Sequence, residues 1–355
     1  MNLKKNSTKL KSMESFIKDP NPEEGLKLIE SLYNEKSLCV KIPYTPDSII
    51  FSSLLMKYFN GDFAISFSSL NCEVQLLQNE QGKWINSNDK QVFLGNSAFS
   101  SILPLSKDDL LPILSGISIS SFLERRKTSE WENKIIEKAK AMGVTVEKNL
   151  KIPAYNELPL FLSLMLSFDP YLPQITGNRE NAINFIKELG VNETTKLSEL
   201  NETQLNTFLY KIMTIAIKLN PRISRDDIIS DRIFYFNYDL LEVSLALIYF
   251  MDIIGSKYLI QFSLNPSIIG ILIDKFRENV AKGFKIDILD NKGKYYIVDS
   301  ELKSPTLISI FLQQIEKNKI IKTIVIKDND TYLTSRYFLS SEEEGLIKID
   351  IKDKN

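Results

Sequence analysis

The sequence predicts an α/β protein that begins with a parallel-sheet domain, continues through a helical region and ends in a smaller α+β domain. Three observations predict this class. The first 150 residues alternate helical and strand patterns, the middle of the chain carries apolar residues at helical spacing, and mixed patterns return from about residue 255. We therefore expect domain divisions at 1–150, 151–254 and 255–355.

The N-terminal domain is expected to be a sheet with crossover helices. Its first helix follows Asn21, which can cap it, with Pro22 at the first helical position and Glu24 closing a capping box. The second helix is expected to have its cap at Asp47 or Ser48. The expected strands are short and apolar, as buried parallel strands tend to be, and lie at 37–42, 63–67 and 91–94.

Helices dominate the middle of the chain. A capping box of Ser129 and Glu132 opens one helix, and an apolar stripe from Leu205 to Leu219 predicts another, which Pro221 terminates. The C-terminal domain is expected to hold, in order, a helix at 267–281, a hairpin at 291–293, a helix opened by Ser304 and Pro305, and paired strands around Asn329.

The absence of histidine excludes several kinds of chemistry. None of the 355 residues carries an imidazole, so Ser-His-Asp and Cys-His nucleophilic sites and His-ligated zinc or iron are closed to the chain. A content of 43% hydrophobic and 25% charged residues is ordinary for a globular protein with a sizeable core. Because the formal net charge is -1, sequence-blind binding of nucleic acid driven by total charge is not expected.

The cysteines and the apolar stretches favour a cytoplasmic protein. Cys39 and Cys72 stand alone, without a C-x-x-C pairing, which fits a reducing compartment and excludes a structural zinc site. No stretch approaches the roughly 20 apolar residues of a membrane span, so 243–251 is interpreted as a buried helix. The basic first fifteen residues lack the apolar core of a secretory signal.

Three segments resemble archaeal RecJ-type DHH proteins. Residues 167–190, SFDPYLPQITGNRENAINFIKELG, resemble a stretch in which a Pro-rich turn and a glycine-containing loop lead into a helix. Residues 37–59, SLCVKIPYTPDSIIFSSLLMKYF, lie where that family has its first strand, metal motif and first helix. Residues 331–336, TYLTSR, resemble a strand of the DHH-associated domain near bound DNA. The resemblance implies a DHH phosphoesterase-like sheet domain and a truncated DHH-associated domain.

The departures from the family's pattern fall on its metal ligands. In active members, the loop after the first strand supplies a His and two Asp to a pair of divalent metals, and the matching positions here are Pro43, Thr45 and Asp47. Gly95 stands where the family has a further aspartate. Since two ions need several ligands, we expect no bound metal, no cofactor and no phosphoesterase activity.

The resemblance therefore implies a scaffold. Inactive RecJ-like proteins form the replisome family of eukaryotic cell division control protein 45 and its archaeal counterparts. The likeness to the archaeal branch implies binding to the GINS complex, association with the MCM helicase through GINS, a contact with single-stranded DNA, and a place beside the nucleoid in the cytoplasm. Four basic residues are candidates for the DNA contact, although a solvated surface is the simpler interpretation of each: Arg125, Arg126, Lys127 and Arg336.

Two other functions remain open from the sequence. One is a metal-dependent nuclease or phosphodiesterase built on carboxylates alone, with Asp226, Asp227, Asp231, Asp239 and Glu242 as its acidic residues. Ser224 with Asp227 fits a helix cap better than a metal site. The other is a free-standing module that binds single-stranded DNA, against which the charge balance argues.

Overall fold

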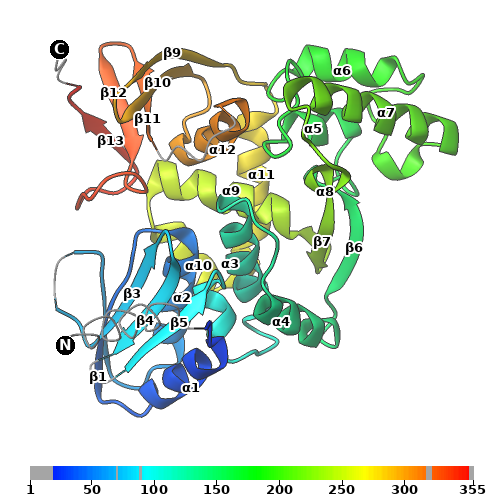
Figure 1. Ribbon diagram of the computed structural model, residues 1–355. Coiled ribbons are helices and arrows are strands. Elements are labelled where there is room, and N and C mark those ends of the chain that lie inside the picture. Colours follow the sequence, from blue (N-terminus) through cyan, green and yellow to red (C-terminus); the bar gives the residue numbers. More distant parts are fainter. Residues whose placement is uncertain (1–18, 69–70, 88–89, 317–321, 352–355) are drawn as a thin grey trace, which may run out of the picture.

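The computed structural model describes residues 19–68, 71–87, 90–316 and 322–351 (Figure 1). These residues form a five-stranded N-terminal sheet, a three-stranded middle sheet and a five-stranded C-terminal sheet, with helices between them. The architecture is mixed α/β, as the sequence predicts.

The N-terminal sheet has the strand order β2-β1-β3-β4-β5. Its strands are β1 (Ser37–Lys41), β2 (Asp62–Ser66), β3 (Val74–Asn79), β4 (Gly82–Ser87) and β5 (Lys90–Gly95). β1 runs parallel to β2 and β3, whereas β3, β4 and β5 form an antiparallel meander. The prediction that 91–94 is a parallel strand is therefore wrong. A short apolar run shows burial, here beneath α1, and carries no information on the direction of pairing.

Capping residues set the starts of the surrounding helices. Asn21 caps the first helix and accepts a hydrogen bond from the Glu24 N–H at 3.1 Å, but the box predicted with Glu24 is wrong, because the Asn21 N–H donates to the Phe93 carbonyl at 2.7 Å. Ser129 forms the predicted box with Glu132. The predicted cap at Asp47 or Ser48 is wrong, since Thr45 caps the second helix. The helices are α1 (Pro22–Leu32), α2 (Pro46–Tyr58), the 3-10 helix η1 (Phe99–Ile102), α3 (Leu110–Leu123) and α4 (Glu130–Lys140).

The middle region has a hydrophobic core of its own. The predicted stripe of α7 (Glu202–Leu219) buries Phe208, Ile212 and Ala216 in this core. An antiparallel sheet completes this region. Its strand β6 precedes the helical segment in the sequence, and its strands β7 and β8 follow it. The other elements are β6 (Thr145–Leu150), α5 (Leu160–Met165), α6 (Arg179–Lys187), η2 (Leu197–Glu199), α8 (Arg225–Ile228), β7 (Ile229–Tyr235) and β8 (Tyr238–Asp239).

Helix α9 (Leu240–Ile254) joins the N-terminal and C-terminal parts of the chain (Figure 1). It packs against α3, α11 and α12, so one continuous core runs from the N-terminal sheet to the C-terminal sheet. This confirms the buried helix expected at 243–251, and no helix among the described residues is long and apolar enough to cross a membrane. The domain divisions at 150 and 254 remain predictions.

The C-terminal sheet has the order β13-β12-β11-β10-β9, and its elements include the hairpin and the strands around Asn329 that the sequence predicts. After α9 come α10 (Lys257–Leu264), η3 (Pro266–Ile268), α11 (Ile269–Val280), β9 (Ile286–Lys292), β10 (Tyr295–Ser300), α12 (Pro305–Glu316), β11 (Thr323–Asp328), β12 (Thr331–Ser335) and β13 (Leu346–Ile349).

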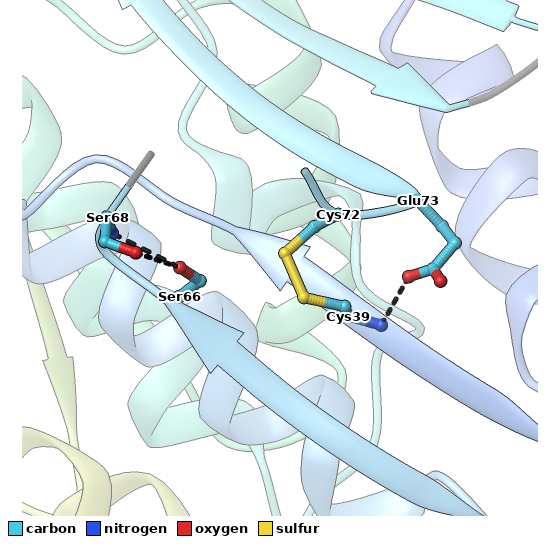
Figure 2. The surroundings of a disulfide bond; sticks show 5 residues. All are labelled: Cys39, Ser66, Ser68, Cys72 and Glu73. Carbon is cyan, nitrogen blue, oxygen red and sulfur yellow. Dashed lines mark hydrogen bonds between the residues drawn. A yellow bond between two sulfur atoms is a disulfide. The ribbon is translucent and has the colours of Figure 1, made fainter. Parts of the chain in front are cut away.

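The two cysteines form a disulfide, so the prediction that they stand alone is wrong (Figure 2). Cys39 lies on β1 and Cys72 just before β3, and the pairing of these strands, with Val40 opposite Val74, brings the two Cα atoms to 4.8 Å. Glu73 lies beside them and accepts a hydrogen bond from the Cys39 N–H at 2.8 Å. The interpretation of a reducing compartment from unpaired cysteines therefore loses its basis.

Candidate functional site

The loop after β1 lies where a parallel sheet places its binding sites, at the carboxyl end of the strand. Residues 43–46 turn here from β1 into α2, and Tyr44 in this turn contacts Arg336 of the C-terminal part of the chain. The ring of Tyr44 lies 5.2 Å from the ring of Phe67, and the guanidinium of Arg336 lies 4.8 Å from each of them. The expected site is therefore in contact with the segment that follows β12.

Pro43 and Thr45 build the start of α2. The Thr45 hydroxyl lies 2.8 Å from the hydroxyl of Ser48, which also donates to the Pro43 carbonyl at 2.5 Å. These bonds satisfy polar groups at the helix terminus. Both positions, which hold metal ligands in the family the sequence resembles, serve a helix cap in this chain.

Asp47 is buried and turned into the protein. Its two carboxylate oxygens accept hydrogen bonds from the backbone N–H groups of Phe99 at 2.7 Å and Ser100 at 3.0 Å, at the start of η1. Burial raises the pKa of Asp47, and the charge of Lys83 and the bonds from Ser100 and Phe99 oppose this rise. The carboxylate thus ties α2 to η1.

Gly95 ends β5 in a conformation that an aspartate would adopt only with strain. Its φ is +61°, in the left-handed region, and a Cβ atom built there would lie 2.8 Å from Cγ of Pro20. A side chain at this position would therefore need both an unfavourable backbone and a shift of Pro20.

Lys83 lies opposite Gly95 on β4 and sends its ammonium group into the protein, where the side chain is 2% exposed. Its Nζ atom lies 2.5 Å from Glu124 Oε1 and 2.5 Å from Ser120 Oγ at the end of α3. Burial alone would raise the pKa of Glu124, but the charges of Lys83 and Arg126 lower it below its ordinary value. The ammonium group of Lys83 therefore supplies a positive charge in this interior, and this charge also opposes the rise in the pKa of Asp47.

Arg126 extends the charge pairing to α4. Its Nε donates to Glu124 at 2.7 Å, and its two terminal nitrogens donate to both oxygens of Glu132 at 2.7 and 2.9 Å. Burial disfavours the charged guanidinium, yet Glu132 and Glu124 raise the pKa of Arg126 overall. Glu132 in turn accepts from the Ala98 N–H at 2.7 Å. Two cations and two carboxylates thus neutralise one another in fixed geometry.

The other basic candidates lie in two places. Arg125 and Lys127 flank Arg126 on the turn after α3, and the side chain of Arg125 is 35% exposed with Nε 3.4 Å from Asp169. Arg336 is 9% exposed and pairs with Glu344 at 3.4 Å. A DNA phosphate would have to compete with these carboxylates for Arg126 and Arg336, whereas Arg125 is held more loosely.

The side chain of Asp226 lies outside the described part of the structure, and the other acidic residues of the carboxylate-only alternative do not converge. Each of these four has a partner or an exposed position: Asp227 accepts from the Ser224 hydroxyl at 2.8 Å, Asp239 pairs with Arg232 at 2.5 Å, Glu242 pairs with Arg277 at 2.6 Å, and Asp231 is exposed on β7. Within the described parts of the chain, no group of three or more Cys, Asp or Glu side chains is arranged to hold a metal ion.

The fold places the chain among α/β proteins with a DHH-like fold. It is similar to the crystal structure of CDC45 from Entamoeba histolytica, with a TM-score of 0.50 and 9% sequence identity, over 88% of this chain and 87% of that chain. No curated protein sequence matches it. A family model described as archaeal Cdc45 matches residues 13–352. The chain belongs to the archaeal Cdc45 family, and this membership supports a role in DNA replication, as part of the replisome.

The Lys83 network gives the first prediction. Lys83→Met should leave Glu124 without its closest cation and lower the free energy of unfolding by about 3 kcal/mol, since breaking a buried pair on one side is costly. Lys27→Met is the matched control, because Lys27 pairs with Glu23 at 3.6 Å with both side chains about two-thirds exposed, and should cost at most ~1 kcal/mol. Urea unfolding of both variants measures the difference. Equal stability of the two variants would contradict the structural role of Lys83.

A second prediction concerns Asp252, which is fully buried at the end of α9. It accepts hydrogen bonds from Ser304 at 2.6 Å and from the Thr306 N–H at 2.8 Å, and burial raises its pKa to about 6 despite these bonds. The folded state therefore binds this proton more tightly than the unfolded state does, so its contribution to stability is lost as the pH rises from about 4 to about 6.

Asp252→Asn should remove this pH dependence. The shift from 3.8 to about 6 corresponds to roughly 3 kcal/mol, so the variant should gain up to that much relative to the wild type between pH 4 and pH 7. Chemical unfolding of both proteins across this range measures the gain. A constant difference between them would refute the assignment.

Proposed function

We propose that this protein is a non-catalytic scaffold of the replisome that binds the GINS complex and, through GINS, supports the MCM helicase. Membership of the archaeal Cdc45 family supports this role. The observation that carries it is the charge-paired interior beside Gly95, where Lys83 and Arg126 pair with Glu124 and Glu132 and the charge of Lys83 also acts on Asp47, the one carboxylate left at the expected metal site. We further propose that the protein uses no cofactor and lies in the cytoplasm beside the nucleoid.

Single-stranded DNA is proposed as a weak, secondary ligand. Arg125 and Lys127 are the better candidates for a phosphate contact, because Arg126 and Arg336 are mostly enclosed by carboxylates and aromatic rings. Binding through such residues should fall steeply with salt, because it releases counterions from DNA. The function of a scaffold that binds other proteins would not depend on this DNA binding.

The proposed loss of catalysis gives a third prediction. Incubation with single-stranded DNA and Mn²⁺ or Mg²⁺ should give no degradation above that of a mock purification, because Pro43, Thr45 and Gly95 supply no carboxylate and Asp47 is committed to η1. Cleavage that disappeared in a folded Asp227→Ala variant would instead support the carboxylate-only nuclease.

Association with GINS is the fourth prediction. The purified chain mixed with the GINS complex of the same cell should elute as one species in size-exclusion chromatography at micromolar concentration, and the complex should survive moderate salt, as expected for an interface of at least about 1,000 Å². Arg125→Ala with Lys127→Ala should weaken DNA binding and leave this elution unchanged. Separate elution together with salt-resistant DNA binding would favour the free-standing DNA-binding module.

A further inference from the structure

We infer that the edge strand β9 is an attachment site for an extended segment of a partner protein, which adds a strand to the C-terminal sheet. Because this surface would serve the scaffold described above, it rests on the proposed function and assigns a place on the molecule to one of its partners.

The first observation is the open edge itself. Among the described residues, β9 pairs only with β10 and ends the strand order of the C-terminal sheet, and with seven residues it is the longest strand of that sheet. The strand at the opposite edge, β13, has four. The outer backbone N–H and C=O groups of a long edge strand form a template for another strand.

The second observation is apolar surface at that edge. Ile288 and Leu289 are 41% and 50% exposed. Ile288 pairs across the sheet with Val298, which is fully buried, so the two side chains lie on the same face. Ile288 is exposed because none of the strands in the described parts of the chain lies outside it. An apolar residue on an added strand would continue this face and cover Ile288.

The third observation is a row of charges on the other face. Asp287, Asp299 and Lys327 lie opposite one another on β9, β10 and β11, and all three are exposed. The open end of the row is therefore acidic, with two carboxylates on neighbouring strands, and Asp287 forms no ion pair within the described residues. Like charges at such positions repel, so a Lys or Arg on the next strand would be stabilised there.

These observations together define the occupant. It is an extended segment that places an apolar side chain beside Ile288 and a basic side chain beside Asp287, on alternate faces of one strand. A second copy of β9 fits poorly, since antiparallel pairing centred between Ile288 and Leu289 would set Asp287 of each copy against Asp290 of the other. The register shift opposite Ile297 and Val298 also protects the edge from indiscriminate pairing.

Hydrogen exchange with purified GINS as the probe tests this surface. Amides of β9 should exchange at least about tenfold more slowly in the complex than in the free chain, because strand addition bonds them. Ile288→Lys and Asp287→Lys should each weaken GINS binding by about tenfold or more, whereas Ile271→Lys, at a 59% exposed position on α11, should change it by less than about twofold. Thermal unfolding checks that each variant is folded, and the exchange of the wild-type chain needs no variant.

The outcomes separate this surface from the proposed function. If GINS binds without protecting β9 and Ile288→Lys binds equally well, the surface assignment is overturned and the scaffold function stands. If the wild-type chain does not bind GINS, the proposed function fails and the surface fails with it. Self-association of the chain that Ile288→Lys abolishes would make a second copy the occupant and would also overturn the assignment.

Discussion

The N-terminal half of the molecule depends on the pairing of the buried ammonium group of Lys83 with Glu124. An ammonium group enclosed to this extent would cost several kcal/mol without a partner. Glu124 supplies the partner charge. It also accepts a hydrogen bond from Arg126, which donates to both oxygens of Glu132 as well. These contacts join β4, the end of α3 and the first turn of α4. Removing any one charge leaves an excess of the opposite sign in a poorly hydrated interior, so the members are interdependent.

The same logic explains why the remaining carboxylate of the expected metal site, Asp47, is structural. It is satisfied by two backbone N–H groups of η1 and by the charge of Lys83, and Gly116 on α3 lies so near that a Cβ atom built there would come within 2.9 Å of its Oδ1. A site that binds a divalent cation needs a surplus of oxygen ligands. Here the surplus is absent, because protein cations already compensate the carboxylates. The proposed loss of catalysis therefore shares its cause, charge pairing within the protein, with the stability of the fold.

Helix α9 connects this N-terminal part to the C-terminal part and is held by polar contacts at both of its ends. Its N-terminal cap Asp239 pairs with Arg232, and its last turn carries Asp252, which accepts hydrogen bonds from the residues that open α12. Polar anchors at both ends of a buried helix fix its position along its axis, which apolar packing alone does less well. Arg336, between the rings of Tyr44 and Phe67, adds a direct contact across the two halves.

Much of the fold was predictable, because its signals are local. The caps at Asn21 and Ser129 and the stripe of α7 depend on residues a few positions apart, and these predictions are confirmed. The failures are contacts between distant residues. The sequence does not show that Cys39 meets Cys72, that β5 runs antiparallel, or that Lys83 turns inward to meet Glu124, since strand pairing decides all three. The residue in the sequence that comes nearest to indicating the Lys83 site is Gly95. Only the pairing register of the sheet shows that Lys83 lies opposite it on β4.

Titration with Mn²⁺ tests most directly whether protein charges have replaced the metal. A site with a Kd of roughly 10 µM would raise the free energy of unfolding by about 2.7 kcal/mol at 1 mM Mn²⁺, which is readily measured as a rise in the unfolding temperature. With Lys83 and Arg126 already neutralising the carboxylates, we expect no saturable rise in that temperature and no heat of binding by calorimetry. A saturable stabilisation that is lost when Asp47 is replaced by Asn would contradict the account.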